Sequence, residues 1–253
     1  MKYIPKLFNE FSMKANLREV DPKGQTRRII QPQMENAYAC EANEDGTFDL
    51  MCGTERDGVF CDYPVQVKPP CQSGDVLWAR ETWFERGYWD DGFGYKNHYG
   101  YAADLADFGM FDYGEGELYV EGEDDLRSRS SMFMPRDACR YFGLVTKPCR
   151  AERVQDISEE DALAEGVTFM SGRGRATLRD EYRGIWNDIN AKPKPVYGTV
   201  DGKKQIVSYV SYPWEDIREE KTHRGKLWHV IGNPWVWVIS YARTTKPAGW
   251  PEV

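Results

Sequence analysis

The chain has 253 residues, of which 41% are hydrophobic and 14% aromatic, so it is long and apolar enough to bury a sizeable core. It has no run of about 18 apolar residues, and its first residues lack the apolar stretch of a secretory signal. We therefore expect a cytoplasmic protein with no membrane partner. The net charge of -8 at first argues against a polyanionic partner.

The charges are unevenly distributed along the chain. Residues 97–126 include nine Asp and Glu and no Lys or Arg, and without that span the rest is close to neutral. Residues 127–153 reverse the balance, with seven Arg and Lys against two acids. A solvated basic face beside an acidic loop would explain this pattern. The alternative is an acidic segment that docks a basic host protein.

The first half of the chain alternates regular and irregular segments. Apolar residues at helical spacing predict a helix over Lys6–Val20, which Pro22 should end. A short strand is expected at Thr26–Ile30. A strand-prone segment follows at Val76–Phe84, interrupted by two charged residues. Six cysteines without a C-x-x-C pair predict reduced thiols. The alternative is a zinc site made by the four thiols of one segment: Cys40, Cys52, Cys61 and Cys71.

The second half carries clearer signals. Ser158 as N-cap and Gly166 at the exit predict a short helix, and a second helix is expected over residues 177–189. Trp235–Ile239 is apolar on both faces and predicts a central strand. Shorter strands are expected at residues 98–103, 141–145 and 150–154. Polar, Gly- and Pro-rich segments without a clear period are predicted to be insertions: residues 33–70, 85–130 and 191–228. Together these elements predict one α+β domain over residues 1–253, a small β-barrel with flanking helices and large loop insertions.

The stretch DPKGQTRR, residues 21–28, is the first candidate site. Lys23 and Thr26 would suit a nucleophile pair in which the amine activates the hydroxyl. Arg27 and Arg28 would suit an anion. The alternative is a solvated basic turn with no ligand.

Other candidates lie further along the chain. Arg80 and Glu81 interrupt an apolar strand, where unpaired charges are costly. Trp83 offers a stacking surface for a base, unless it is simply core. Arg136 follows a rigid Met-Pro turn and would suit a phosphate or carboxylate. Glu165 ends the predicted short helix, where a carboxylate gains nothing from the helix dipole and favours a partner elsewhere, such as Lys23.

Six segments in order resemble the ASCH group of the PUA-like superfamily, as encoded by tailed bacteriophages and prophages and often labelled phage or morphogenetic proteins. The segments are KGQTRRII, GDVLWARETW, MPRDACRYFGLVT, RVQDISEEDALAEGV, YRGIWNDIN and NPWVWVISY. The resemblance implies a PUA-like β-barrel that binds RNA or holds a modified nucleobase, here in the cytoplasm of a host cell. Some small ASCH proteins remove an acyl group from N4-acylated cytidine without a metal or other cofactor.

The residues of that activity map onto this chain one at a time. The resemblance places the family's Lys on Lys23, its Thr on Thr26 and its Glu on Glu165, with the loop Arg on Arg28. Pro22 and Gly24 differ from the residues that usually flank this Lys. Binding and hydrolysis are therefore kept as separate hypotheses.

Three functions follow from these observations. The first is binding of RNA, single-stranded DNA or a modified nucleoside, with Arg27, Arg28, Arg80, Glu81, Trp83 and Arg136 as ligand-binding residues. The second is an N4-acylcytidine amidohydrolase with Lys23 as base, Thr26 as nucleophile and Glu165 as proton carrier. The third is docking of a host protein through the acidic span 97–126. None of the three requires a metal or a cofactor.

Overall fold

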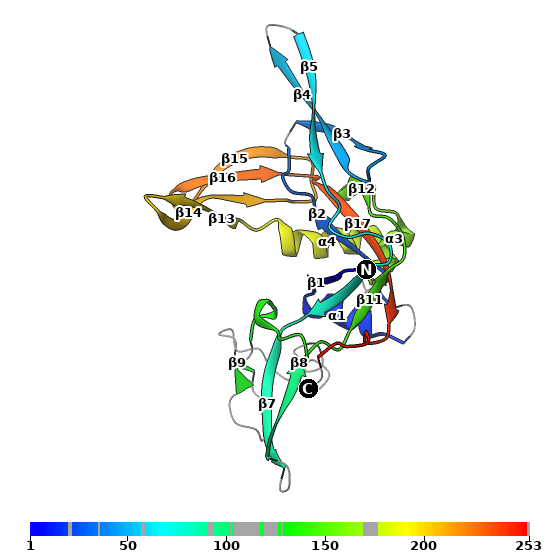
Figure 1. Ribbon diagram of the computed structural model, residues 1–253. Helices are drawn as coiled ribbons and strands as arrows, with labels where there is room; N and C mark the ends of the chain where they lie inside the picture. The colour runs from blue at the N-terminus through cyan, green and yellow to red at the C-terminus, as the bar shows by residue number, and fades with distance from the viewer. Residues whose placement is uncertain are drawn as a thin grey trace. The chain divides into compact units, whose positions relative to one another are not determined.

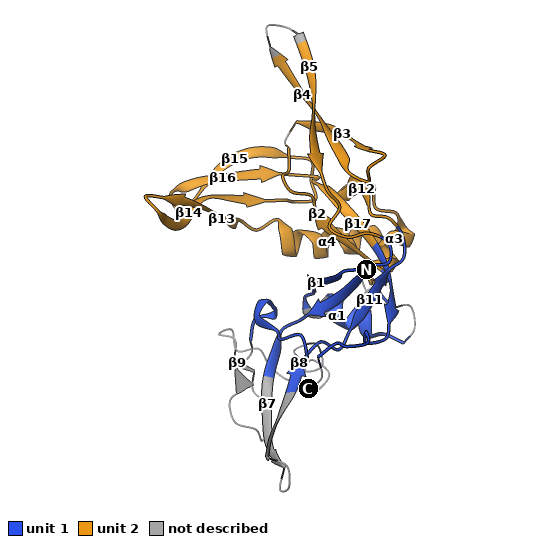
Figure 2. Ribbon diagram, in the orientation of Figure 1, with its two compact units in different colours: residues 1–24, 73–147, 240–253 blue, residues 25–72, 148–239 orange. Residues whose placement is uncertain are grey.

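The computed structural model describes residues 1–19, 22–34, 36–56, 59–90, 94–101, 103, 117–118, 126–127, 129–168 and 177–251. The chain divides into two compact units, which Figure 2 shows in different colours. Unit 1 comprises residues 1–24, 73–147 and 240–253, and unit 2 comprises residues 25–72 and 148–239. Strands dominate and helices are few, which confirms the α+β class. No described helix has the length and apolar character needed to cross a membrane.

Unit 1 is built on a sheet in the order β1-β6-β11-β17, to which β17 contributes its last residues. Strand β1 runs parallel to β6, and the other pairs are antiparallel. Its regular elements are β1 (Tyr3–Leu7), α1 (Glu10–Leu17), β6 (Val76–Arg80), β7 (Trp83–Asp90), β8 (Gly94–Tyr101), β9 (Glu117–Leu118), β10 (Leu126–Arg127), a 3-10 turn (Ser131–Phe133) and β11 (Phe142–Val145).

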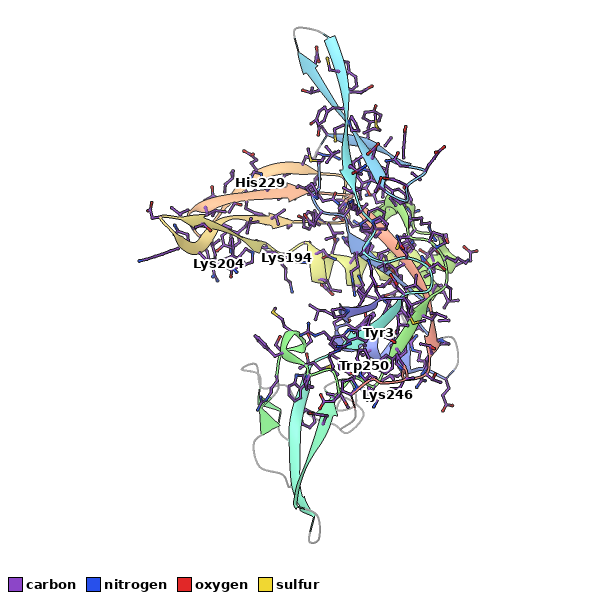
Figure 3. All side chains as sticks on the ribbon, viewed as in Figure 1. Tyr3, Lys194, Lys204, His229, Lys246 and Trp250 are labelled. Atoms are coloured by element: carbon purple, nitrogen blue, oxygen red, sulfur yellow. The ribbon has the colours of Figure 1, made fainter. Side chains whose placement is uncertain are left out.

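An aromatic cluster forms much of the core of unit 1. Trp250 meets the rings of Tyr3, Trp78 and Phe142 edge-on, at centroid distances of 5.5, 5.5 and 5.0 Å. Figure 3 labels Tyr3 and Trp250. Edge-to-face geometry is the preferred packing of aromatic rings. The C-terminal Trp250 therefore helps to tie β1, β6 and β11 together.

Unit 2 contains the remaining elements, labelled in Figure 1. They are β2 (Gln25–Ile29), β3 (Ala37–Ala42), β4 (Phe48–Arg56), β5 (Val59–Val67), β12 (Arg150–Arg153), a 3-10 turn (Val154–Asp156), α3 (Glu159–Ala164), α4 (Leu178–Asn190), β13 (Lys194–Val200), β14 (Lys203–Ser211), β15 (Arg218–His223), β16 (Lys226–Ile231) and the first half of β17 (Trp235–Thr244).

Strand β17 is the centre of unit 2, with β12 and β2 both paired to it. One face carries Val236, which belongs to a core cluster with residues of α3 and α4 such as Ala162 and Trp186. The opposite face carries Trp237, whose ring meets Phe48 of β4 at 4.9 Å. Residues of a strand alternate between faces, so the apolar run in β17 serves two layers at once. The sequence prediction of a central strand agrees with this arrangement.

The strands do not form the closed barrel expected from the sequence. Among the described strands, the sheet has the order β1-β6-β11-β17-β12, and its two end strands, β1 and β12, are not paired with each other. Closure would require the two end strands to pair with each other. Pro5 lies within β1 and Pro148 just precedes β12. Proline cannot donate to a strand ladder and is typical of sheet edges.

The predicted insertions contain regular structure. Residues 37–67 form the antiparallel sheet β3-β4-β5, and residues 194–231 form the sheet β13-β14-β16-β15. In the remaining insertion, β7 and β8 pair as a hairpin, and most of residues 102–128 lie outside the described residues. Two tight turns mark the hairpins of the second sheet, because Asp201-Gly202 and Arg224-Gly225 all have positive φ. Such turns match the twist of paired strands.

The predicted helices differ in accuracy. Ser158 accepts a hydrogen bond from the amide of Asp161 at the start of α3, and Gly166 at its exit has φ of +87°, as predicted. At the N-terminus, however, the helix is shorter than Lys6–Val20. Asn9 caps α1 by accepting from the amide of Ser12 at 2.8 Å, and the residues before it form β1. An Asn before a helical run is a start signal that the apolar spacing obscures.

Candidate functional site

The stretch 23–27 is buried, which contradicts the alternative of a solvated basic turn. The side chains of Lys23, Gln25, Thr26 and Arg27 all belong to buried residues, as does Glu165. Lys and Glu are almost never fully buried unless they are paired. The polar side chains of this stretch therefore need partners inside the protein.

Strand β2 positions these side chains by pairing with β17. The amide of Ile30 donates to the carbonyl of Trp235 at 3.0 Å within unit 2. Because adjacent residues of a strand point to opposite faces, Gln25 and Arg27 share one face, and Thr26 and Arg28 point to the other. The face of Arg27 is the one covered by α3 and α4.

Arg27 is the centre of an ionic cluster. Its guanidinium donates to Glu152 through Nε at 2.9 Å, to Asp161 through Nη2 at 2.9 Å and to Glu165 through Nη1 at 3.3 Å. The side chain of Arg27 is fully buried, and that of Glu165 is 4% exposed. Arg150 also bonds both Glu152 and Asp161. Strand β12 and helix α3 thus supply the carboxylates that meet the guanidinium of Arg27 on β2.

The cluster sets the charge state of its members. Burial acts to lower the pKa of Arg27, but the negative charge of Glu165 and of the groups around it outweighs burial, and the pKa is raised above its ordinary value. Arg27 is therefore a permanent cation. Burial, and then the charge of Glu165, raise the pKa of Tyr182 well above the usual tyrosine value. The phenol of Tyr182, whose ring centroid lies 5.9 Å from the guanidinium carbon, therefore stays neutral.

Gln25 adds an unpaired donor on the same face. Its amide nitrogen is buried and has no hydrogen-bond partner among the described residues. A buried amide without a partner costs free energy and calls for an explanation. Two residues away on the same strand, Arg27 binds Glu165. An acceptor supplied by a ligand would satisfy the donor of Gln25.

Lys23 lies in unit 1, just before the chain enters unit 2. Its amide donates to the carbonyl of Ala15 at 3.0 Å, and the residue is 5% exposed. Thr26 is three positions after Lys23, so their Cα atoms are at most about 11 Å apart.

The remaining predicted site residues all lie in unit 1. Glu81 is buried and binds Arg140 through two bonds of 2.8 Å, Nε to Oε1 and Nη2 to Oε2. This partner of Glu81 lies 59 positions further along the chain. The carboxylate of Glu81 thereby has the bidentate geometry that buried pairs need.

Arg80, Trp83 and Arg136 surround the aromatic cluster of unit 1. The guanidinium of Arg136 lies 4.4 Å from the ring centroid of Trp250, and Arg80 lies 5.6 Å from that of Trp78. The buried nitrogens Nε of Arg80 and Nε1 of Trp83 have no hydrogen-bond partner in the described part of the chain. Trp83 itself is 4% exposed and belongs to the core cluster, so its ring is packed rather than presented.

The structure therefore divides the predicted site residues between the two units. Thr26, Arg27, Arg28 and Glu165 lie in unit 2, and Lys23, Arg80, Glu81, Trp83 and Arg136 lie in unit 1. Arg27 and Glu165, which are 138 positions apart, are in direct contact. No single prediction placed them together, although each was a candidate by itself.

Sequence reasoning missed the other members of the cluster. They are Gln25, Arg150, Glu152, Asp161 and Tyr182. Two signals were available. Glu152 stands between basic residues in a predicted strand. Asp161 belongs to the acidic first turn of α3, where a carboxylate can pair with a cation as well as stabilise the helix dipole.

The zinc alternative and the docking role of the acidic span stay hypotheses. Within the described ranges, no group of three or more His, Cys, Asp or Glu is arranged to hold a metal ion. None of the six cysteines is in a disulfide. Most of the acidic span 97–126 lies outside the described residues.

Comparisons with protein-family models, with curated proteins and with solved structures find no match to this chain.

Proposed function

We propose that this chain binds nucleic acid or a modified nucleobase, in a PUA-like site formed around residues 25–28 and Glu165 of unit 2. One observation carries the proposal: Gln25, Thr26 and Arg27 all have buried polar side chains, and the amide nitrogen of Gln25 has no hydrogen-bond partner among the described residues. The six sequence segments that resemble the ASCH group support the same ligand class. A phage origin is part of this proposal.

The chemistry of the site suits the edge of a base. Arg27 keeps a cation beside Glu165, and a carboxylate is the kind of acceptor to which the exocyclic amine of a base donates. The amide of Gln25 would donate to a ring carbonyl. A cytosine-type base carries both an amine and a carbonyl on one edge. Binding would thereby satisfy the donor that is buried without a partner.

Calorimetric titration with cytidine, N4-acetylcytidine and uridine tests the proposal. The variant Gln25→Met keeps the volume but removes the donor, and we expect about tenfold weaker binding, the value of one hydrogen bond. The free energy of unfolding should change little, because the amide nitrogen has no hydrogen-bond partner among the described residues. Gln66→Met, at an exposed position of β5, is the matched control. Absence of nucleoside and oligonucleotide binding at low salt would refute the proposal.

An amidohydrolase activity is the second candidate, favoured by the burial of the three residues carried over from the family: Lys23, Thr26 and Glu165. In this proposal Lys23 takes the proton of the Thr26 hydroxyl, and the oxygen attacks the acyl carbonyl. Glu165 passes the proton taken up by Lys23 to the leaving amine, and water then hydrolyses the acyl ester of Thr26, which releases the carboxylic acid and restores the hydroxyl. Incubation with N4-acetylcytidine tests it. If Thr26→Ala deacetylates as fast as Thr222→Ala, an exposed control, the mechanism is wrong.

A further inference from the structure

The sheet β13-β14-β16-β15 carries a concentration of positive charge in an acidic chain. We call residues 194–206 and 221–227, which comprise β13, the first part of β14 and the turn between β15 and β16 with its flanking residues, the basic arm. The basic arm has six Lys and Arg and one acidic residue, whereas the whole chain has a net charge of -8. The described cations there are Lys194, Lys203, Lys204, Lys221, Arg224 and Lys226. Figure 1 shows the strands as one long sheet.

One face of this sheet collects the aromatic side chains. Tyr209 and Trp228 lie opposite each other in the parallel pair β14–β16, and the ring of His223 lies 4.7 Å from Tyr209 and 6.1 Å from Trp228. Pro195 pairs with Tyr209, so Tyr197, two residues further along β13, points to the same side. We call this side the aromatic face.

Lysines stand over the rings of the aromatic face. Lys204 lies 5.0 Å from the ring centroid of Tyr197, and Lys221 lies 5.6 Å from that of Trp228. Lys226 is opposite His223 and shares its side. Lys203 is adjacent to Lys204 in β14 and therefore points to the other side. Figure 3 labels Lys204 on this hairpin.

The aromatic face is open where the lysines are. Tyr197 is 55% exposed, and Lys204, Lys221 and Lys226 are exposed. Trp228 is held in place by donating its indole N–H to the hydroxyl of Ser211 at 2.9 Å. A fixed ring costs little entropy when a ligand stacks on it. The base of the sheet is anchored to α4, since the amide of Tyr212 donates to Asn190.

We propose that the aromatic face of the basic arm binds single-stranded nucleic acid, with lysines on the phosphates and Tyr197 and Trp228 stacking on bases. Alternating cations and rings on a sheet are the pattern of single-strand binding. A duplex would use the cations but has no free base faces for the rings. The inference rests on the proposed function and adds a backbone-binding surface to the base site around Gln25 and Glu165.

The test uses the full chain and fluorescein-labelled 12-mers of uridine and thymidine at several salt concentrations. For Lys204→Ala we expect the slope of log affinity against log salt to fall by about 0.7, and affinity to drop about fivefold at 0.1 M salt. Lys203→Ala makes the same charge change on the opposite side and should have less than half this effect. Equal effects of the two variants would overturn the assignment to the aromatic face.

A second pair of variants tests stacking. Tyr197→Leu should weaken oligonucleotide binding about tenfold with the salt slope unchanged. Tyr38→Leu is the control, since Tyr38 is 53% exposed on β3. A polyglutamate peptide of equal charge and a duplex of equal length should bind more weakly. Equal binding of the peptide would show a surface for any polyanion and overturn the proposal, and so would equal binding of the duplex.

The results separate the two proposals. If the basic arm is not used, oligonucleotides will bind no more tightly than free nucleosides, while Gln25→Met still weakens the nucleosides. If the base site is absent, nucleosides will not bind, and any oligonucleotide affinity will depend on Lys204 and Tyr197 but not on Gln25.

Discussion

Replacing Arg27 by methionine should destabilise the protein strongly. The change removes the only guanidinium that joins Glu152, Asp161 and Glu165 in the described cluster. Glu165 has little access to water to replace the lost bond, because its side chain is 4% exposed. Breaking a buried ion pair by removing one partner costs about 3–5 kcal/mol. We expect a loss in that range.

The pair Arg183–Glu215 supplies a matched control. It has a similar Arg–carboxylate contact of 2.6 Å, but the two side chains are 51% and 37% exposed. Arg183→Met should therefore cost under about 1 kcal/mol. In urea unfolding monitored by circular dichroism, Arg27→Met should lower the midpoint by about 1–2 M and Arg183→Met by a few tenths.

A double variant isolates the charge effect. Adding Glu165→Gln to Arg27→Met should recover part of the loss, because a neutral amide does not need a counter-ion in the interior. If Arg27→Met and Arg183→Met shift the midpoint equally, or if the second substitution adds a further loss, the cluster does not carry the energy assigned to it.

Two further predictions concern stability. Gly232→Ala should destabilise by about 1–3 kcal/mol or more, because an added Cβ would lie 1.9 Å from the carbonyl oxygen of Glu215, whereas Gly184→Ala on the exposed side of α4 meets nothing within 4 Å and should stabilise by about 0.5–1 kcal/mol; thermal unfolding of both variants checks the opposite signs. In unit 1, burial raises the pKa of Cys139 to about 11 and of Tyr141 to about 12. Because these groups ionise in the unfolded chain near their ordinary pKa values of 9.0 and 10.0, the stability they contribute is complete below pH 9 and is lost as the pH rises toward 11 and 12. The free energies of unfolding from urea titrations at pH 8 and pH 10.5 should differ by about 2–3 kcal/mol, and Cys139→Ala should show a smaller difference. An equal difference in the variant would contradict the assignment.

Local signals in the sequence were enough for several elements. Ser158 and Gly166 mark the two ends of α3, and Thr177 with Asp180 starts α4 through reciprocal hydrogen bonds between neighbours. Caps and turns involve residues three or four apart, so a short stretch of sequence is enough to predict them. The same holds for the apolar run of β17, which required a strand covered on both faces.

Other local signals were present but hidden by composition. Asp201-Gly202 is a strong hairpin signal, yet both sides of β13 and β14 are largely polar or exposed, so no alternation of apolar residues revealed the strands. The closed barrel was expected from the resemblance and from the number of strands. Whether strands close depends on which pairs with which, and that information is not local.

The sequence alone determined the α+β class and the central strand, and it singled out residues 23–28 and Glu165 as candidates for a site. Only the tertiary structure decided what Arg27 does. It brings together Arg27, Glu152 and Glu165, which are up to 138 positions apart, and it buries Arg27 and Glu165. Ion pairs on a surface contribute little to stability, whereas buried charges must be paired for the protein to fold. The burial of this cluster depends on the packing of α3 and α4 over β2 and β17.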